Sequence, residues 1–277
     1  MKKWTDRIRD RLKSQRPVDW RASESLPRSP LLALEDWKLQ DGELKEWSER
    51  GLSPAARDWL FAGGDCGDRV RELGPQIFEL EGFFDPLWLS RFGQEIERIR
   101  RWVLQENVQF RPPNSMHYGG FELAPVGLGG LINQLSCELM TPLARRLYPD
   151  RDWPVLEDGH GFLAEYGPGA DRDLSLHVDD SDITMTLCLG DQFEGSEVVF
   201  EGLRCPLHQQ TPHRSEEVLS VMPVPGRALV HLGAHRHRVS PLLSGNRQSL
   251  ILWSRGLQSQ DERMGIGVTE CPDWCEA

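Results

Sequence analysis

Long apolar runs are missing from this chain of 277 residues. No run reaches the length of about 18 apolar residues that a transmembrane helix needs, and the N-terminus lacks the apolar block of a secretory signal. We therefore expect a soluble, cytoplasmic protein without integral membrane association. Histidine is absent before His117, so the first part of the chain offers no histidine-based metal site.

An excess of basic residues is also missing. The chain has 32 Lys and Arg against 43 Asp and Glu, for a net charge of −11. Because nucleic-acid binding depends on positive surface charge, this balance argues against nucleic acid as a general partner. The acidic balance by itself names no other partner.

Cysteine is too scattered for a disulfide framework in a chain without an export signal. The six cysteines are Cys66, Cys137, Cys188, Cys205, Cys271 and Cys275. The last two form C-x3-C, which could supply two zinc ligands, with a histidine or Cys205 completing the set. A structural zinc needs four ligands and no second close pair is evident, so a free thiol pair capping the tail is the favoured interpretation.

Two parts of different character divide the chain. Residues 1–74 begin with a basic amphipathic segment, continue through the Pro- and Ser-rich "RASESLPRSP", and end in an acid-rich, Trp-containing stretch. This pattern predicts an α-helical N-terminal extension that packs on the core or engages a partner. Residues 75–277 are predicted to form the catalytic domain, with a short Cys-containing tail.

A candidate metal site begins with His177-x-Asp179 in "HVDDSD". On a β-strand these two side chains project from the same face, where they can bind one ion. His237 lies further along the chain. Two neutral imidazoles and one carboxylate leave three octahedral positions open, which is typical of non-haem Fe(II) oxygenases. A bidentate 2-oxo acid and O2 would occupy them.

Arg247 is the candidate partner for that 2-oxo acid. If the chain reverses about Leu242, in a turn marked by Pro241 and Gly245, then His237 and Arg247 lie opposite each other on neighbouring strands. Arginine presents a planar fork of donors that matches a carboxylate bidentately. The spacing predicts that Arg247 binds the far carboxylate of 2-oxoglutarate.

These segments carry a resemblance. "HVDDSD", "ITMTLCLG", "FEGSEVVFEG" and "HRHRVSPLLSGNR" follow one another in the order found in the prolyl 4-hydroxylase and lysyl hydroxylase superfamily of 2-oxoglutarate- and Fe(II)-dependent dioxygenases. Within it the chain, roughly from Gly74 to Cys275, resembles the animal 2-oxoglutarate and iron-dependent oxygenase domain-containing protein 2 group. The resemblance implies an α+β, mainly β, double-stranded β-helix (jelly roll) flanked by helices. It also implies Fe(II), 2-oxoglutarate and O2 for the reaction, with ascorbate as the reductant that keeps the iron reduced.

The resemblance selects His237 as the distal ligand, because only this histidine lies at the family's spacing from Arg247. His231, His235 and His237 share a face if the strand is continuous, yet Gly233-Ala234 suggests a break or bulge. His235 is the alternative ligand; a role beside the metal or in substrate protonation is open, and a solvated loop histidine is the more ordinary interpretation. Asp180 and Asp182 are expected to solvate the strand end and form the turn, with contact to a cationic substrate as the alternative.

Two positions depart from the family pattern. Where many prolyl hydroxylases place a tyrosine that binds the 5-carboxylate of 2-oxoglutarate, this chain has Cys188, and Tyr166 or Thr184 could substitute. The glycine pair of the turn becomes Gly195-Ser196, which affects loop shape and leaves the metal ligands unchanged.

The predicted function is a dioxygenase that hydroxylates a C–H bond of an unidentified substrate, either a peptidyl prolyl or lysyl group or a small molecule, with succinate and CO2 as co-products. One alternative is a non-catalytic sensor or scaffold that binds metal and 2-oxoglutarate. The other is a metallohydrolase that uses the same ligands for Zn2+ and an activated water. Arg247 has no evident role in the hydrolase.

Overall fold

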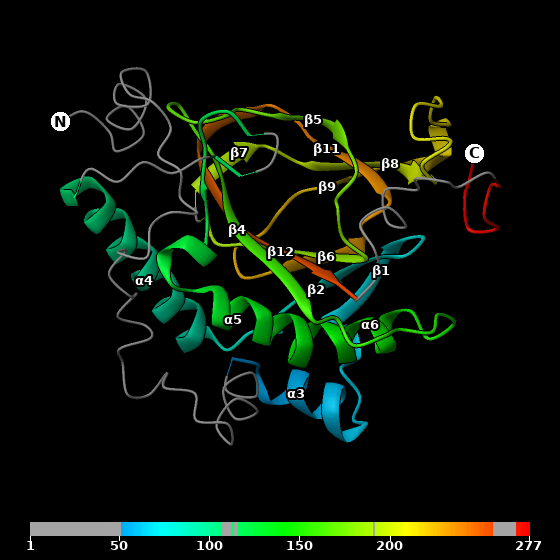
Figure 1. The fold of residues 1–277 in the computed structure, drawn as a ribbon, viewed down its shortest axis with the longest axis horizontal. Coiled ribbons are helices and arrows are strands. Elements are labelled where there is room, and N and C mark those ends of the chain that lie inside the picture. Colours follow the sequence, from blue (N-terminus) through cyan, green and yellow to red (C-terminus); the bar gives the residue numbers. More distant parts are fainter. Residues whose placement is uncertain (1–50, 107–111, 114–115, 191, 257–269) are drawn as a thin grey trace.

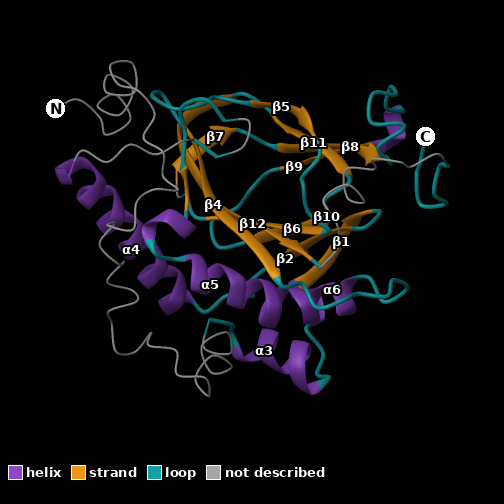
Figure 2. Cartoon of the chain, in the orientation of Figure 1, coloured by secondary structure: helices purple, strands orange, loops and turns teal. Residues whose placement is uncertain are grey.

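A computed structural model of the protein describes residues 51–106, 112–113, 116–190, 192–256 and 270–277. In these residues the strands form two antiparallel sheets that lie one above the other, and helices cover the outer face of the larger sheet (Figures 1 and 2). The predicted fold class, a mainly β jelly roll with flanking helices, is confirmed. The basic start and the Pro/Ser linker of the predicted extension lie outside the described residues.

The larger sheet has the strand order β1-β2-β10-β6-β12-β4-β3, with β7 paired to β12. Its longest strand, β12, lies between β4 and β6 and connects them along most of its length. The strand bounds are β1 Val70–Gly74, β2 Ile77–Leu80, β3 Phe121–Glu122, β4 Asp158–Tyr166, β6 Ile183–Cys188, β7 Gln192–Gly195, β10 Ala228–Leu232 and β12 Leu242–Arg255.

The smaller sheet has the order β5-β11-β8-β9. Its strands are β5 Leu174–His177, β8 Val198–Leu203, β9 Val218–Val221 and β11 His235–Val239. A short turn at Gly233-Ala234 separates β10 of the larger sheet from β11 of the smaller one. The predicted break at this pair is therefore present, and the chain uses it to change sheets.

Helices pack against the larger sheet through the main hydrophobic cluster. The amphipathic helix α4 contributes Phe92, Ile96 and Val103 to it. The α-helices are α3 Pro54–Arg57, α4 Pro86–Glu106, α5 Gly129–Gln134 and α6 Thr141–Leu147; the π-helical turns are η3 Asp58–Ala62 and η6 Leu135–Met140; the 3-10 turns are η4 Gly67–Arg69, η5 Ala124–Val126 and η7 Ser215–Glu217.

Strand alternation decides which side chains of the larger sheet face the smaller one. In β12, Leu250 and Leu252 belong to the cluster beneath the helices, whereas Arg247, Ile251 and Trp253 line a cavity on the other face. The same period of two places Leu163 of β4 against the helices and its neighbours toward the cavity. The sheet is thus buried on both faces.

The packing of the described chain does not divide at Gly74. Leu52, Ala56 and Leu60 are buried in the main cluster, and the Ser53 N–H donates to the Phe83 carbonyl over 2.8 Å. Strand β1 also pairs along β2. Residues 51–74 therefore pack as part of the folded core, and the rest of the predicted 1–74 extension lies outside the described residues.

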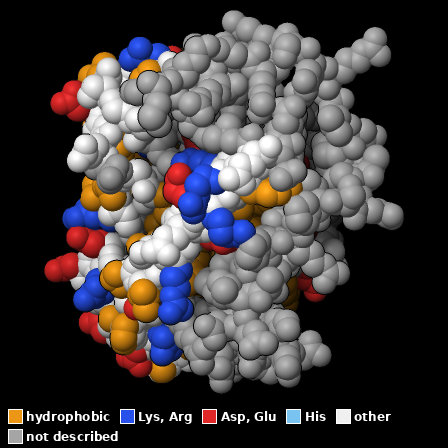
Figure 3. Space-filling model, turned by 90° about the vertical axis from the view of Figure 1, so that its left-hand side faces the viewer, with side chains coloured by type: hydrophobic (Ala, Val, Ile, Leu, Met, Phe, Trp, Pro, Cys, Tyr) orange, Lys and Arg blue, Asp and Glu red, His pale blue; other side chains and the backbone are white. Residues whose placement is uncertain are grey.

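Among the helices that the structure describes, none combines the length and the apolar character that crossing a bilayer would need. On the described part of the face in Figure 3, acidic and basic side chains lie side by side among hydrophobic ones.

Candidate active site

His177, Asp179 and His237 converge between the two sheets. His177 is the last residue of β5, and His237 lies within β11, its antiparallel neighbour. The Asp179 Oδ1 atom is 3.6 Å from His177 Nε2 and 3.8 Å from His237 Nε2. One ligand atom from each residue lies within 4.8 Å of the others, so the three can bind one ion.

Asp179 does not lie on the strand as expected. Strand β5 ends at His177, and Asp179 follows in the loop, where its N–H donates to the Gly233 carbonyl over 3.0 Å. Gly233 is needed for this contact, because a Cβ there would lie 1.9 Å from the carbonyl oxygen of Ser181. The loop, held by the turn between the two sheets, thus brings the carboxylate to the histidines.

Hydrogen bonds orient all three side chains. Nδ1 of His177 lies 2.7 Å from the Ser175 carbonyl, and Nδ1 of His237 lies 3.0 Å from the His235 carbonyl. Since a carbonyl only accepts, each Nδ1 carries the proton and each Nε2 presents its lone pair. The Thr184 hydroxyl donates to Asp179 Oδ2 over 2.7 Å and leaves Oδ1 for the ion.

Burial favours the protonation states that a metal needs. Desolvation, helped by the neighbouring His237, lowers the pKa of His177 to about 4, so its imidazole is neutral near pH 7. Burial alone would raise the pKa of Asp179, but the surrounding imidazoles and the Thr184 hydroxyl outweigh it and lower that pKa. The site therefore offers neutral nitrogens and an ionised carboxylate.

The two other histidines of the segment lie outside the ligand set. His235 is 3% exposed, packs on Phe200 and does not join the three converging ligand atoms. The expectation of a solvated loop histidine is wrong, because the turn at Gly233 starts β11 at His235 and buries its ring. His231 lies behind the site, with its Nε2 3.9 Å from Asp179 Oδ2 and its Nδ1 bonded to the Leu232 carbonyl.

His237 and Arg247 do not face each other across a hairpin. His237 lies on β11 in the smaller sheet, whereas Arg247 lies on β12 in the larger one and pairs with Tyr166. The chain crosses between the sheets at Ser240-Pro241, because the edge of β12 that would have received β11 is paired with β7. Both residues still line one cavity, reached from opposite sheets.

Arg247 is buried, and only some of its hydrogen-bond donors have partners among the described residues. Its Nη1 donates to the Ser196 carbonyl over 2.8 Å and to the Ser196 hydroxyl over 3.2 Å. Its Nε has no hydrogen-bond partner among the described residues. Desolvation lowers the pKa of the guanidinium, which still remains charged at neutral pH. A buried cation with an unused donor calls for an anion in the adjacent space.

That space is a cavity of 420 Å3 between the sheets. The three converging residues lie on its smaller-sheet side and Arg247 on the other. Its remaining walls are mainly apolar, formed by Pro113, Met116, Phe162, Ala164, Leu174, Val198, Val239, Ile251 and Trp253. Polar groups concentrated at two places in an apolar cavity are typical of a small-molecule site.

The two residues predicted to assist Arg247, Tyr166 and Thr184, lie at different places in the larger sheet. Tyr166 is the cross-strand partner of Arg247 and lines the cavity. The centre of its ring lies 5.0 Å from Cζ of the Arg247 guanidinium. Thr184 pairs with Trp253 instead, and its hydroxyl is used by Asp179. Cys188 pairs with Ser249, closer to Arg247, and burial raises the pKa of its thiol. Tyr166 is thus at the Arg247 end and Thr184 at the metal end.

Sequence reasoning did not single out Asp171, which holds one wall of the cavity. Its carboxylate accepts the backbone N–H groups of His117, Tyr118 and Gly119 at 2.9 to 3.1 Å. These bonds fix the segment that follows Met116, a cavity residue. The sequence marks this segment only by the pair Gly119-Gly120. In the structure, a Cβ atom at either glycine would collide with the backbone of β4.

Asp180 and Asp182 contact the end of β12, a role that differs from the expected solvation of the strand end. Asp180 binds Arg255 Nη1 at 2.9 Å, and Asp182 accepts the Gly256 N–H at 2.8 Å. Both bonds tie the loop after β5 to the end of β12.

Comparisons with known proteins show which family the chain resembles. Residues 65–152 match the OGFOD2-like domain family. The 2-oxoglutarate and iron-dependent oxygenase domain-containing protein ICU11 of Arabidopsis thaliana is 36% identical over 204 residues, covering 74% of this chain and 51% of that protein. The 2-oxoglutarate and iron-dependent oxygenase domain-containing protein 2 of Mus musculus is 30% identical over 237 residues, covering 84% of this chain and 66% of that protein.

The chain thus spans only about half the length of the Arabidopsis relative. Among solved structures, a Pseudomonas putida prolyl-4-hydroxylase is similar at 17% identity and a TM-score of 0.46, over 66% of this chain and 94% of that one. By the sequence matches, this chain belongs to the family of 2-oxoglutarate and iron-dependent oxygenase domain-containing proteins.

Proposed function

We propose that the chain is an Fe(II)- and 2-oxoglutarate-dependent dioxygenase that hydroxylates a C–H bond of its substrate. The observation that carries the proposal is a pairing across one cavity. Two oriented imidazoles and a carboxylate lie on one side, and a buried arginine with an unused donor lies on the other. A metal and a dicarboxylate would satisfy both ends at once.

His177, Asp179 and His237 would hold the iron. Their donor set suits Fe(II), because neutral imidazole and carboxylate are ligands of intermediate and hard character. The backbone carbonyls that bind both Nδ1 atoms, and the Thr184 hydroxyl on Asp179, keep the ligand atoms aimed inward. The protein therefore needs little rearrangement to accept the ion.

Arg247 would bind the carboxylate of 2-oxoglutarate that lies away from the metal, with Tyr166 beside it. Ser196 holds one end of the guanidinium, which leaves the Nε side free for the co-substrate. The apolar walls exclude water and strengthen this ion pair. When bound, iron and 2-oxoglutarate supply oxidation by O2 with release of succinate and CO2.

The substrate would be a peptidyl prolyl or lysyl group, or a small metabolite. A second cavity of 890 Å3 reaches the opposite side of the Asp179 loop and shares Val178, Asp179 and Asp180 with the first. A side chain entering there would approach the metal site from outside the 2-oxoglutarate cavity.

The decisive experiment measures succinate formation by the full chain with Fe(II), 2-oxoglutarate and O2. We expect slow succinate release without substrate and faster release with a substrate-containing extract, in which untargeted mass spectrometry detects a product heavier by one oxygen. Binding of 2-oxoglutarate without any turnover in extract would favour a sensor. Cleavage of a substrate without O2 would favour a hydrolase. Either result would overturn the proposal.

A further inference from the structure

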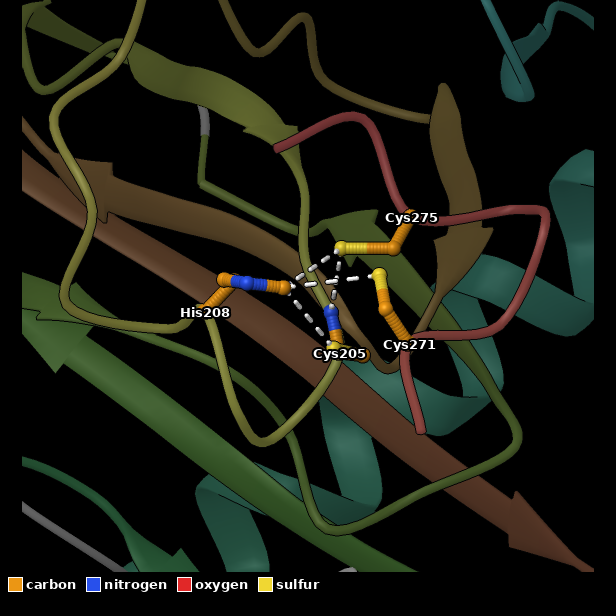
Figure 4. Close-up of side chains that lie close together, drawn as sticks. All are labelled: Cys205, His208, Cys271 and Cys275. Atoms are coloured by element: carbon orange, nitrogen blue, oxygen red, sulfur yellow. Dashed lines mark hydrogen bonds between the residues drawn. The ribbon is translucent and has the colours of Figure 1, made fainter. Parts of the chain in front are cut away.

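Four potential metal ligands form a second cluster away from the candidate iron site. Cys205 and His208 lie in the connection after β8, and Cys271 and Cys275 lie in the C-terminal tail. Figure 4 shows the three cysteine side chains directed toward the ring of His208. One ligand atom from each residue lies within 4.8 Å of all the others.

Hydrogen bonding cannot account for this arrangement. The sulfur atoms of Cys205, Cys271 and Cys275 lie 3.3, 3.5 and 3.5 Å from the same atom, Nδ1 of His208. An imidazole nitrogen has either one proton or one lone pair in the ring plane, so it can serve one of the three sulfurs well. The other two would crowd around it without a bond. A cation at the centre would give all four atoms one common partner.

The spacing matches a tetrahedral zinc ion. With Zn–S bonds of about 2.3 Å and Zn–N bonds of about 2.0 Å, a sulfur and a nitrogen on the same ion lie about 3.5 Å apart. The three observed distances agree with this value. Structural zinc sites commonly take two closely spaced ligands from each of two chain segments. The pairs Cys205-x2-His208 and Cys271-x3-Cys275 have such spacings.

We propose that Cys205, His208, Cys271 and Cys275 bind a structural zinc ion that fastens the C-terminal tail to the end of β8. Three thiolates and one imidazole form a soft donor set that favours zinc over the harder Fe(II). Four protein ligands close the coordination shell, so the ion stabilises structure and has no open position for chemistry. The free thiol pair favoured by the sequence is replaced by a four-ligand site, because folding brings a distant Cys-His pair to the tail.

Neighbouring contacts support the same connection. The Cys205 N–H lies 3.3 Å from Cys275 Sγ, a donor that would stabilise a thiolate ligand. The Glu276 N–H donates to the Leu203 carbonyl over 3.1 Å, and the Leu203 N–H donates to the Glu276 carboxylate over 3.0 Å. These bonds hold the tail beside the proposed ion.

The tail that this ion would fasten also lines the second cavity. Glu270, Pro272 and Trp274 line the 890 Å3 cavity that also reaches Asp179. Trp274 additionally packs against the main hydrophobic cluster. The zinc would therefore hold one wall of the space through which, on the proposed function, a substrate approaches; the zinc site itself does not depend on that function.

The test compares metal contents of the full chain. Purified protein supplied with zinc and iron should contain one zinc that survives dialysis, as measured by inductively coupled plasma mass spectrometry. Cys271→Ser and Cys275→Ser should each lose this zinc and retain iron, whereas Asp179→Ala should lose iron and retain zinc. Cys66→Ser and Cys137→Ser, which alter thiols outside the cluster, serve as controls and should retain both metals.

Cobalt gives a second readout that needs no substitution. Co(II) in a three-thiolate tetrahedral site shows a sulfur-to-metal charge-transfer band and intense visible absorption, whereas Co(II) bound by two histidines and an aspartate has no thiolate band. We expect the thiolate band in the unaltered chain and its loss on addition of excess Zn(II). Absence of this band, a Cys271–Cys275 disulfide in the freshly purified protein, or zinc that disappears with Asp179→Ala and persists in Cys275→Ser would each overturn the proposal.

Discussion

His177 and His237 are direct cross-strand partners in the antiparallel pair β5 and β11, and their ring centroids lie 4.3 Å apart. Each Nδ1 is bonded to the carbonyl two residues earlier on its own strand. Because both bonds arise within the sheet, the two Nε2 lone pairs are aimed before an ion arrives. Asp179 completes the set from a loop and depends on contacts outside that sheet.

The three candidate ligands should each be essential. His177→Ala, Asp179→Ala and His237→Ala should abolish Fe(II) binding and 2-oxoglutarate turnover, because each removes one of only three protein ligands. His235→Ala is the matched control and should keep most activity per folded molecule. Isothermal titration with Fe(II) under anaerobic conditions measures metal binding, and succinate formation measures turnover. Circular dichroism verifies that each variant is folded. An active His237→Ala beside an inactive His235→Ala would show that the ligand assignment is incorrect.

Arg247→Ala should impair co-substrate binding and spare metal binding. Loss of a buried partner of a carboxylate costs on the order of 2 to 5 kcal/mol, which raises the 2-oxoglutarate concentration for half-saturation about thirtyfold or more. Arg247→Lys should recover only part of the loss, since lysine lacks the fork. Arg227→Ala, which removes an arginine paired with Glu79 and Glu81, is the control. Unchanged 2-oxoglutarate affinity in Arg247→Ala would refute the assignment.

Thr184→Val should weaken metal binding without removing a ligand. The variant keeps the shape of the side chain but deletes the hydroxyl that donates to Asp179 Oδ2. Loss of such a supporting bond typically costs on the order of 10- to 100-fold in metal affinity. Thr186→Val is the control for metal affinity, because Thr186 lies on the same strand and lines the cavity, whereas the bond to Asp179 comes from Thr184. If Thr184→Val instead altered 2-oxoglutarate affinity alone, Thr184 would belong to the co-substrate site.

Acid should destabilise the metal-free protein before carboxylates titrate. Burial, with help from neighbouring charged groups, lowers the pKa of His235 to about 3 and that of His231 to about 4. The unfolded chain, with histidine pKa values of about 6.5, binds more protons, so stability falls as pH drops below that value. Between pH 7 and 5 we expect a loss of about 2 kcal/mol per histidine.

Urea unfolding at pH 7, 6 and 5 in the presence of a chelator measures this loss. His235→Gln should reduce this loss of stability by about 2 kcal/mol, while the other histidines whose pKa values are lowered by burial, among them His177 and His231, still titrate. An identical dependence in the wild type and His235→Gln would show that His235 is not held neutral by the fold.

Two shortened chains test where the folded domain begins. A chain starting at Gly51 should fold and bind Fe(II) and 2-oxoglutarate, because the site lies entirely beyond that residue. A chain starting at Gly74 loses buried Leu52 and Leu60, each worth about 2 to 5 kcal/mol when truncated, and most of β1. It should unfold at markedly lower temperature. Failure of the Gly51 chain to bind either ligand would show that earlier residues complete the site.

The sequence by itself determined the chemistry of the candidate site. The order of the H-x-D segment, the later histidines and Arg247 predicted the donor types. The jelly roll followed from the family resemblance. These inferences rest on residue type and short spacing, which local backbone geometry preserves.

Only the tertiary structure decided how distant segments meet. The sequence placed His237 and Arg247 on one hairpin, whereas the fold puts them on opposing sheets, since strand pairing is settled by which edges remain free after the whole sheet assembles. Asp179 reaches the site through Gly233, and Cys205 and His208 reach the tail, by contacts between segments far apart in the chain. Such contacts depend on packing energies summed over the entire core, which no short pattern records.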